Sequence, residues 1–449
     1  MRAGHHGCTP ITSRGEPQVP GRAHYHLRCR WCGARFVDDG FMVSCPGAHP
    51  PSLLVSQYDA RELRPDSEAE GMFRFRGWLP AAQHLVGTSS RIVTYRSPEL
   101  SRLTGLSNLW IGFNGYCPKR GANLATGTFK DLEASSVLAR LPPGQGGRTL
   151  VLASAGNTAA AFARACSEYQ VRCLIVVPRS GLVDLRFAGP IDSCVTVVSL
   201  TGNADYSDAV ALADQLSERL SEMFFSTGGV ASVARRDGVG TAMLNAVETI
   251  GRLPDYYFQA VGSGAGGIAA FEASCRLVAD GRFGERPPRL MLSQNLPYAP
   301  MVASWRSGHR ALLPTAEEAD RAQIRRIAAP VLSNRRPAYA LTGGVFDVLR
   351  HSGGDMLAVD NDEVRAAQRL VEDAEGIDID PAAAVAVASL MRAVHDQRIQ
   401  RDDVILLNVT GAGRRRLERG LAPVHPTLEV DPTAGSSRDT TQQIVDSIG

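Results

Sequence analysis

Along much of the chain, short apolar runs alternate with longer segments in which apolar and polar residues are mixed. Short apolar runs of strand length, such as residues 150–154 and 173–177, are separated by longer segments with helical spacing, such as residues 204–220. Further strands are expected at residues 195–200, 255–261, 290–294 and 404–409, and helices at residues 131–141, 158–169, 228–251, 268–279, 361–375 and 382–398. Strands that alternate with helices in this way are typical of a parallel α/β sheet.

The remaining segments are less periodic and suggest how the chain is divided. Residues 109–113 form an apolar run that predicts a buried strand, and residues 295–355 are irregular and rich in proline. The sequence predicts a flexible tail at residues 1–24, a Cys-rich knuckle at 25–60, a large domain from 90–145 and 230–428, a smaller α/β domain at 146–229 and a second flexible tail at 429–449.

The composition of the chain argues against several kinds of partner. The 449 residues carry a formal net charge of +2 without a basic block, which argues against a nucleic-acid partner. No apolar run is long enough to cross a bilayer, so no membrane partner is expected. The first seven residues lack the apolar segment of a secretory signal, and we therefore expect a cytoplasmic protein.

The knuckle contains a possible metal site. Cys29, Cys32, Cys45 and His49 follow the spacing C-x2-C-x12-C-x3-H, which can place four ligands around a tetrahedral zinc ion. A knuckle without metal and a redox-active cysteine pair are the alternatives. A site with four protein ligands has no open coordination position, so this pattern predicts a structural role.

A glycine-rich turn after a predicted strand indicates a phosphate site. Small residues occupy every position of the turn and a helix follows it: Gly262, Ser263, Gly264, Ala265, Gly266 and Gly267. Small residues let the backbone approach an anion, and a helix start offers unpaired N–H groups. The turn lacks the lysine and threonine of a nucleoside triphosphate loop. An ordinary tight turn is the alternative.

Two other strand ends carry polar groups. The turn Ser154, Ala155, Gly156, Asn157 and Thr158 can hold a carboxylate or a ring oxygen, although simple helix capping explains it equally well. Thr410 ends the last strand, where its hydroxyl can face a heterocycle nitrogen or only stabilise a turn. Because ligands bind at the carboxyl ends of parallel strands, we expect these turns to face one crevice.

Lysine is rare in this chain, which makes one lysine conspicuous. The chain contains only Lys119 and Lys130, and Lys130 lies in a Gly/Thr turn just before a predicted helix. An amine can condense with a carbonyl to form a Schiff base, whereas a guanidinium cannot. A surface lysine is the ordinary alternative. Together with a phosphate cup, an Asn/Ser turn and a distal hydroxyl, however, Lys130 predicts a pyridoxal phosphate site.

These motifs, in this order, resemble the fold-type II pyridoxal phosphate enzymes, a tryptophan synthase β-like fold that includes the threonine synthase family. The resemblance covers roughly residues 25–425. Several further stretches are similar to the cysteate synthases within that family, namely residues 113–116, 128–134, 294–300, 331–335, 376–383 and 406–411. The resemblance implies two parallel-sheet α/β domains with the active site between them, the large one binding the cofactor.

The resemblance also implies a reaction. Lys130 would hold the cofactor and act as general base, with Asn157, residues 262–267 and Thr410 as cofactor contacts and residues 154–158 as substrate contacts. The implied reaction joins O-phospho-L-serine and sulfite to give L-cysteate and phosphate. Alternatives are conversion of phosphohomoserine to threonine, β-replacement with another nucleophile, and an inactive cofactor-binding homologue. Relatives are commonly homodimers, and Lys119, Arg120, Arg335 and Arg336 are candidate anion ligands.

Overall fold

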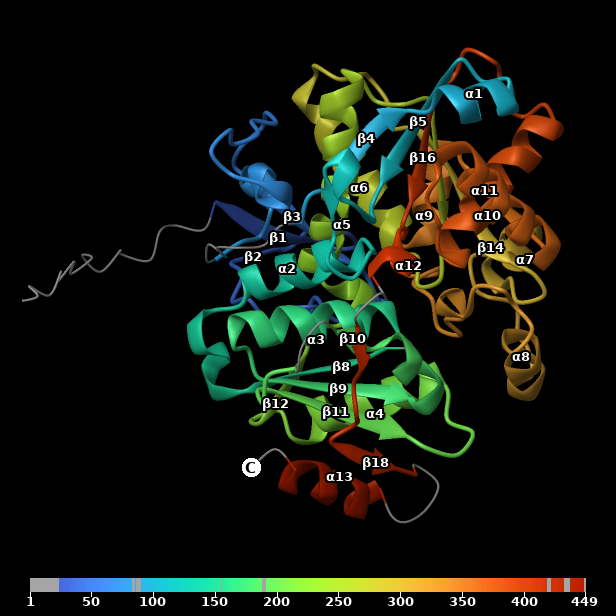
Figure 1. Cartoon of the computed structure of the whole chain (residues 1–449). Coiled ribbons are helices and arrows are strands. Elements are labelled where there is room, and N and C mark those ends of the chain that lie inside the picture. The colour runs from blue at the N-terminus through green and yellow to red at the C-terminus, as the bar shows by residue number, and fades with distance from the viewer. Residues whose placement is uncertain are drawn as a thin grey trace, which may run out of the picture.

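The computed structural model describes residues 24–82, 85, 90–154, 156–187, 191–417, 421–431 and 437–447. Two parallel sheets form its framework (Figure 1). The larger sheet has six strands in the order β15 (Asp355–Val359), β14 (Arg289–Asn295), β13 (Tyr256–Ala260), β16 (Val404–Val409), β5 (Asn108–Phe113) and β4 (Val93–Arg96). Only the edge strand β4 is antiparallel to its neighbour. The expected parallel α/β architecture is therefore confirmed.

The smaller sheet is parallel throughout. Its five strands have the order β12 (Phe224–Ser226), β8 (Thr149–Ala153), β9 (Cys173–Pro178), β11 (Val195–Leu200) and β18 (Leu428–Val430). Central strands of this kind are covered on both faces, which explains why β9 reads as an uninterrupted apolar run. The proposed domain limits at residues 145 and 229 stay predictions.

Helices pack on both sheets and fill the space between them (Figure 1). Those closest to the site are α2 (Lys130–Arg140), α3 (Asn157–Tyr169), α5 (Val233–Ile250) and α6 (Ala265–Asp280). The other α-helices are α1 (Pro98–Thr104), α4 (Tyr206–Arg219), α7 (Pro300–Arg306), α8 (Glu317–Ile324), α9 (Val345–Ser352), α10 (Asn361–Glu375), α11 (Pro381–His395), α12 (Arg414–Leu417) and α13 (Ser437–Asp446). Helix α2 packs against both α3 and α5, and residues Asp131–Arg140 are all buried as a result.

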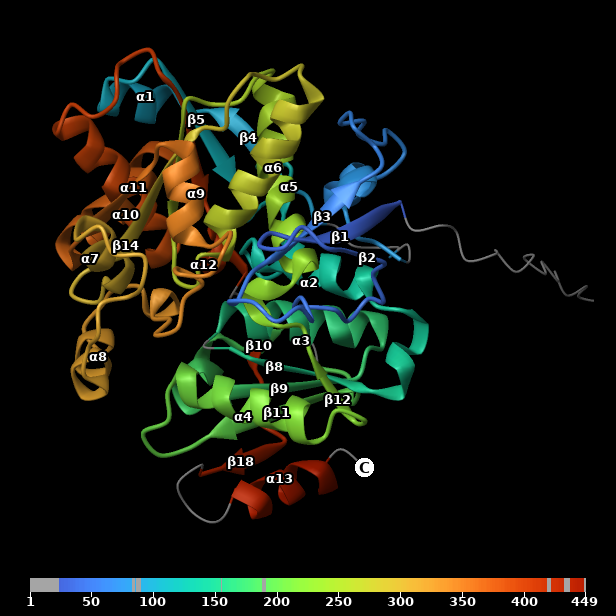
Figure 2. The same ribbon diagram turned by 180° about the vertical axis from the view of Figure 1, so that it is seen from behind.

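The Cys-rich knuckle is a small antiparallel sheet with the order β2 (Arg35–Phe36), β1 (Tyr25–Cys29) and β3 (Leu54–Tyr58). Seen from behind, it lies beside α2 and α5 (Figure 2). Short pairs also occur between β6 (Tyr116–Cys117) and β7 (Ala122–Asn123), and between β10 (Arg186–Phe187) and β17 (Ala422–Pro423). Among the residues that the structure describes, no helix combines the length and the apolar character needed to cross a bilayer.

The structure differs from the sequence expectation at two places. Residues 429–449 were expected to form a flexible tail, but β18 pairs with β11 and α13 follows, with Ile444 fully buried. The irregular segment 295–355 contains helices α7, α8 and α9 and leads into β15. These elements are short, and most of them are held by packing against distant segments rather than by local periodicity. Helix α8 has no buried residue and is held to α4 by the ion pair of Arg321 with Asp208. The predicted tail at residues 1–24 lies outside the described residues except for His24.

Candidate active site

One cavity between the two sheets brings together most of the predicted site. It has a volume of about 490 Å³. Its lining includes Lys130, Ser154, Gly156, Asn157, Thr158, Gly262, Ser263, Gly264, Ala265, Gly266 and Thr410. Gly267 lies behind this surface against Leu292, and Ala155 falls outside the described residues. Four sequence segments that are far apart therefore meet, as expected for turns at the carboxyl ends of parallel strands.

Lys130 opens helix α2 and points its amine at a buried carboxylate. Its side chain is 20% exposed, and Nζ lies 2.5 Å from Glu133 Oε2, one helical turn along. The preceding turn is held in place because Thr126 donates from its backbone N and its hydroxyl to Asp131, at 2.9 and 2.7 Å. Burial raises the pKa of Asp131. The turn therefore presents Lys130 to the cavity in a defined position.

Glu133 is also paired with Arg235 of α5. Arg235 Nη1 lies 2.6 Å from Glu133 Oε1, and Arg235 Nε donates to Thr227 Oγ1 at 2.8 Å. Burial by itself raises the pKa of Glu133, but the charges of Lys130 and Arg235 outweigh it and hold the pKa below its ordinary value. This role of Glu133 was not predicted from the sequence, although its spacing of three residues from Lys130 is a usable signal. No local signal marks Arg235, which is brought here only by the packing of α2 on α5.

The glycine-rich turn packs so tightly that it needs its glycines. Gly264 adopts a φ of +90° and a Cβ there would lie 2.3 Å from Val345 Cγ2. A Cβ on Gly266 would lie 2.0 Å from Nε2 of Gln259, whose Oε1 accepts from Tyr257 and Asn408. Helix α6 begins at Ala265, so its first N–H groups have no partner within the helix and lie at the cavity. This arrangement suits an anion.

Replacing Gly266 by alanine should therefore damage the turn. The new methyl group would press on a buried, hydrogen-bonded amide that cannot move without breaking its own contacts. We expect a loss of stability of ~1–3 kcal/mol, the range for overpacking a buried site. Gly77→Ala is the matched control, because a Cβ there meets no atom within 4 Å. Equal denaturation midpoints for the two variants would contradict the packing argument.

The Ser154 turn fulfils the capping role considered as its alternative. Ser154 Oγ accepts from the backbone N of Gly156 and Ala159, at 3.1 and 2.9 Å, at the start of α3. Asn157 Oδ1 instead accepts from Arg414 Nη1 at 3.2 Å, and its side chain lines the cavity. Ser154 thus shapes the turn, whereas Asn157 is placed to meet a ligand.

Thr410 directly follows β16 and lines the same cavity as Lys130 and the glycine-rich turn. It is 7% exposed, and its backbone oxygen accepts from the N of Phe129 at 3.0 Å. The neighbouring residue Gly411 forms a β-bridge with Thr128. These bonds tie the lysine turn directly to the strand that carries the hydroxyl.

The four candidate anion ligands have different environments in the structure. Arg336 lines the cavity with an exposed side chain. Arg335 pairs with Asp205 and Glu317, at 3.2 and 3.0 Å, and Arg120 pairs with Glu375 at 2.7 Å. Neither Arg120 nor Lys119 is among the lining residues. Arg336 is therefore the member of this group best placed to meet an anion in the cavity.

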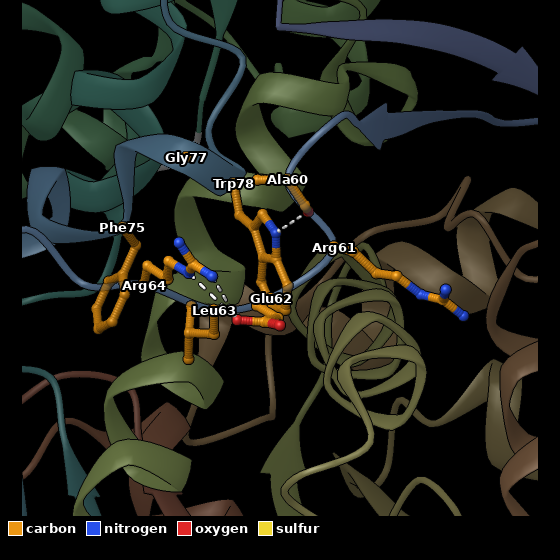
Figure 3. Close-up of a pocket in the computed structure, with 8 residues that line it drawn as sticks. All are labelled: Ala60, Arg61, Glu62, Leu63, Arg64, Phe75, Gly77 and Trp78. Atoms are coloured by element: carbon orange, nitrogen blue, oxygen red, sulfur yellow. Dashed lines mark hydrogen bonds and ion pairs between the residues drawn. The ribbon is translucent and has the colours of Figure 1, made fainter.

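Figure 3 shows a second cavity, of about 330 Å³, that does not contain this chemistry. Two polar contacts lie within it: Trp78 Nε1 donates to Ala60 O at 2.7 Å, and Arg64 pairs with Glu62 at 2.9 Å. None of the site residues predicted from the sequence lines it. The candidate metal ligands Cys29, Cys32, Cys45 and His49 gather separately in the knuckle.

Comparison with known proteins agrees with the geometry. Residues 95–411 match the family described as "Pyridoxal-phosphate dependent enzyme". A protein of Methanocorpusculum labreanum named cysteate synthase is 46% identical over 397 residues, which cover 88% of this chain and 94% of that protein. A Methanosarcina mazei protein of the same name is 42% identical, covering 90% of this chain and 96% of that protein.

Solved structures share the fold at low sequence identity. Threonine synthase from Escherichia coli superposes with a TM-score of 0.61 at 16% identity, covering 94% of this chain and 99% of that one. Maize serine racemase gives a TM-score of 0.53 at 18% identity, covering 72% of this chain and 89% of that one. The fold-type II architecture expected from the sequence is confirmed.

Proposed function

The chain belongs to the family of pyridoxal-phosphate dependent enzymes, and we propose that it forms L-cysteate and phosphate from O-phospho-L-serine and sulfite. The observation that carries an enzymatic role is the meeting of Lys130, the glycine-rich turn and Thr410 in one cavity. The choice of substrates rests on the cysteate synthases, whose similarity extends over nearly the whole chain.

The residues of the cavity fit pyridoxal phosphate. The Lys130 amine would hold its aldehyde carbon, the N–H groups at the start of α6 would bind its phosphate, and Thr410 would place a neutral hydroxyl at its ring nitrogen. Asn157 would contact its ring oxygen. The glycines let this turn pack against Val345 and Gln259, which holds the start of α6 at the cavity. When bound, the cofactor supplies an electron sink for the charge left at the substrate α-carbon.

Lys130 Nζ would serve as the general base that removes the α-proton of O-phospho-L-serine. Glu133 holds this amine at 2.5 Å and is itself held by Arg235, so the nitrogen has a fixed resting position. The bond to the β-phosphate then breaks, and sulfite forms the new carbon–sulfur bond at the same β-carbon. Phosphate leaves with the electron pair of the broken Cβ–O bond, and Lys130 returns the proton to the α-carbon, so the overall replacement is balanced.

Both co-substrates carry negative charge, which the cavity mouth can accommodate. Arg336 offers a planar fork of donors, and Ser333 and Asn334 beside it also line the cavity. Arg235 is less suited to this task because its charge is paired with buried Glu133 through Nη1, and its Nε donates to Thr227. We therefore assign Arg336 to the phosphate or sulfite anion.

The substrate assignment is tested by measuring phosphate release from two donors. The purified chain is incubated with O-phospho-L-serine plus sulfite and, separately, with phosphohomoserine, and cysteate is identified by mass spectrometry. We expect phosphate and cysteate in equal amounts from the first mixture only. Release from phosphohomoserine alone would instead establish the threonine-forming alternative.

Arg336→Ala should weaken anion binding without removing the chemistry. We expect the KM for sulfite or O-phospho-L-serine to rise by a factor of ~10 to 150, since one charge-assisted contact contributes about 1.5–3 kcal/mol, while kcat changes less. Arg325→Ala, another exposed arginine outside the cavity lining, is the control. An unchanged KM for both anions would show that Arg336 does not bind them.

We also propose that the protein acts as a homodimer in the cytoplasm. The support is the resemblance to a family whose members are commonly homodimers. Light scattering would give a mass twice the 48.1 kDa of the chain if the dimer forms.

A further inference from the structure

The knuckle gathers four metal-ligating atoms in a region that the proposed reaction does not use. The Sγ atoms of Cys29, Cys32 and Cys45 and a ring nitrogen of His49 all lie within 4.8 Å of one another. Cys29 Sγ is 3.4 Å from His49 Nε2, and Cys32 Sγ is 3.8 Å from Cys45 Sγ. These spacings match a tetrahedral zinc site, because Zn–S bonds of about 2.3 Å and Zn–N bonds of about 2.0 Å imply S–S and S–N edges of about 3.8 and 3.5 Å.

The surroundings of His49 prepare one nitrogen for a metal. His49 Nδ1 lies 2.8 Å from the backbone oxygen of Pro50. A carbonyl oxygen only accepts hydrogen bonds, so Nδ1 carries the proton and Nε2 presents its lone pair toward the cysteines. The exposed Trp31 ring stacks on the imidazole at a centroid distance of 6.2 Å. An outer partner that sets tautomer and orientation is usual for a metal-bound histidine.

The sulfurs are supported in the same manner. Gly47 N approaches Cys45 Sγ at 3.4 Å, and Cys29 Sγ lies 3.7 Å from Ser52 Oγ. Cys32 and Cys45 are free thiols, so no disulfide competes for these positions. Three thiolates and one imidazole complete a tetrahedron without leaving a position for substrate, which indicates a structural ion.

Two of the four ligands, Cys45 and His49, lie in a loop that contacts helix α2 and strand β12. Residues 37–49 contain no helix or strand, and the structure describes all of them. Asp38 forms a buried pair with Arg140 of α2 at 2.7 Å, and Phe41 packs edge-on against Phe225 of β12 at 4.9 Å. Val43 lies against Gly228, where a Cβ would be 2.8 Å from it.

Gly228 and its neighbour Thr227 line the active-site cavity. The loop therefore stands behind the cavity wall, and its far end is anchored by Cys45 and His49. We propose that Cys29, Cys32, Cys45 and His49 bind one structural Zn²⁺ ion, which fixes the loop of residues 37–49 against the cavity wall at residues 227–228.

Metal content tests the first half of the proposal. The full chain is purified without chelator, loaded with zinc sulfate, dialysed and analysed by elemental mass spectrometry. We expect about one zinc ion per chain, which the Cys32→Ser/Cys45→Ser double variant loses and the Cys194→Ser control keeps. His49→Cys should retain the ion, because it restores a four-thiolate site. Wild-type protein without zinc, or a double variant with as much zinc as wild type, would overturn the proposal.

Two further measurements use only the wild-type chain, so they do not depend on how the variants fold. Cobalt-loaded protein should show the visible bands of tetrahedral Co²⁺ and thiolate-to-cobalt charge transfer, whereas an octahedral spectrum would contradict the site. Intact mass of unreduced protein should equal that of free thiols, and a loss of two hydrogens through a Cys32–Cys45 disulfide would favour the redox alternative.

Hydrogen exchange tests the effect on the loop. We expect amides of residues 37–49 to exchange at least tenfold faster after zinc is removed by chelation, and those of residues 226–232 to exchange faster as well. Exchange in α10, which is distant in the fold, serves as the internal control. Unchanged exchange in residues 37–49 would show that the ion does not hold the loop. Neither readout depends on catalysis, so these results stand apart from the proposed reaction.

Discussion

Lys130→Ala should abolish turnover, lowering phosphate release from O-phospho-L-serine and sulfite by ~10³-fold or more, because one side chain acts both as covalent anchor and as base. Its amine lies in the cavity with the glycine-rich turn and Thr410 around it. No other amine side chain is close at hand to replace it, since the only other lysine, Lys119, does not line the cavity.

The covalent role has its own measurement. Borohydride reduction of the wild-type protein followed by digestion should leave the cofactor attached to the peptide that contains Lys130. The control is Lys119→Ala, which removes the other lysine of the chain and should keep both the attachment and the activity. Label on the Lys119 peptide, or full turnover by Lys130→Ala, would refute the assignment.

Glu133→Gln should destabilise the protein by ~3 kcal/mol at neutral pH, because it removes one partner of a buried ion cluster and leaves Arg235 without its countercharge. Glu133 is 2% exposed and contacts two cations, at 2.5 and 2.6 Å. The denaturation midpoint in urea reports the loss. In the control, Glu99→Gln breaks an exposed pair with Arg102 and should leave the midpoint almost unchanged.

The effect of Glu133 should depend on pH in a defined direction. Its pKa is lowered in the folded protein, despite the opposing effect of burial, by the charges of Lys130 and Arg235. A lowered folded-state pKa stabilises the protein above the unfolded value, near 4.3, and this contribution is lost as pH falls through the folded value. The difference in the free energy of unfolding between wild type and Glu133→Gln should therefore be largest at pH 7. It should shrink under acid conditions below about pH 4. A difference independent of pH would exclude a charged Glu133 as its source.

The periodicity of apolar residues was sufficient to predict a helix or strand where the element is long or fully buried. The expected helix at residues 361–375 matches α10, and the apolar run at 404–409 matches β16. The same reasoning failed for β18 and for α7–α9, which are short and depend on partners far along the chain. For the site, turn chemistry at strand ends predicted residues 262–267, Asn157 and Thr410 as neighbours, because parallel topology places such turns at one edge.

The sequence by itself determined the parallel α/β class, the rarity of Lys130 and the motif order, because these depend on local spacing and residue chemistry. Only the tertiary structure decided that Arg235 joins Lys130 and Glu133. The packing of α2 on α5 brings Arg235 to Glu133, whose three-residue spacing along α2 already places it beside the Lys130 amine. The tertiary structure likewise gives two neighbouring arginines different environments. Arg336 lines the cavity, whereas Arg335 is ion-paired beside it. The reason is that charge pairing depends on distances in space between residues a hundred positions apart, and no local pattern records those distances.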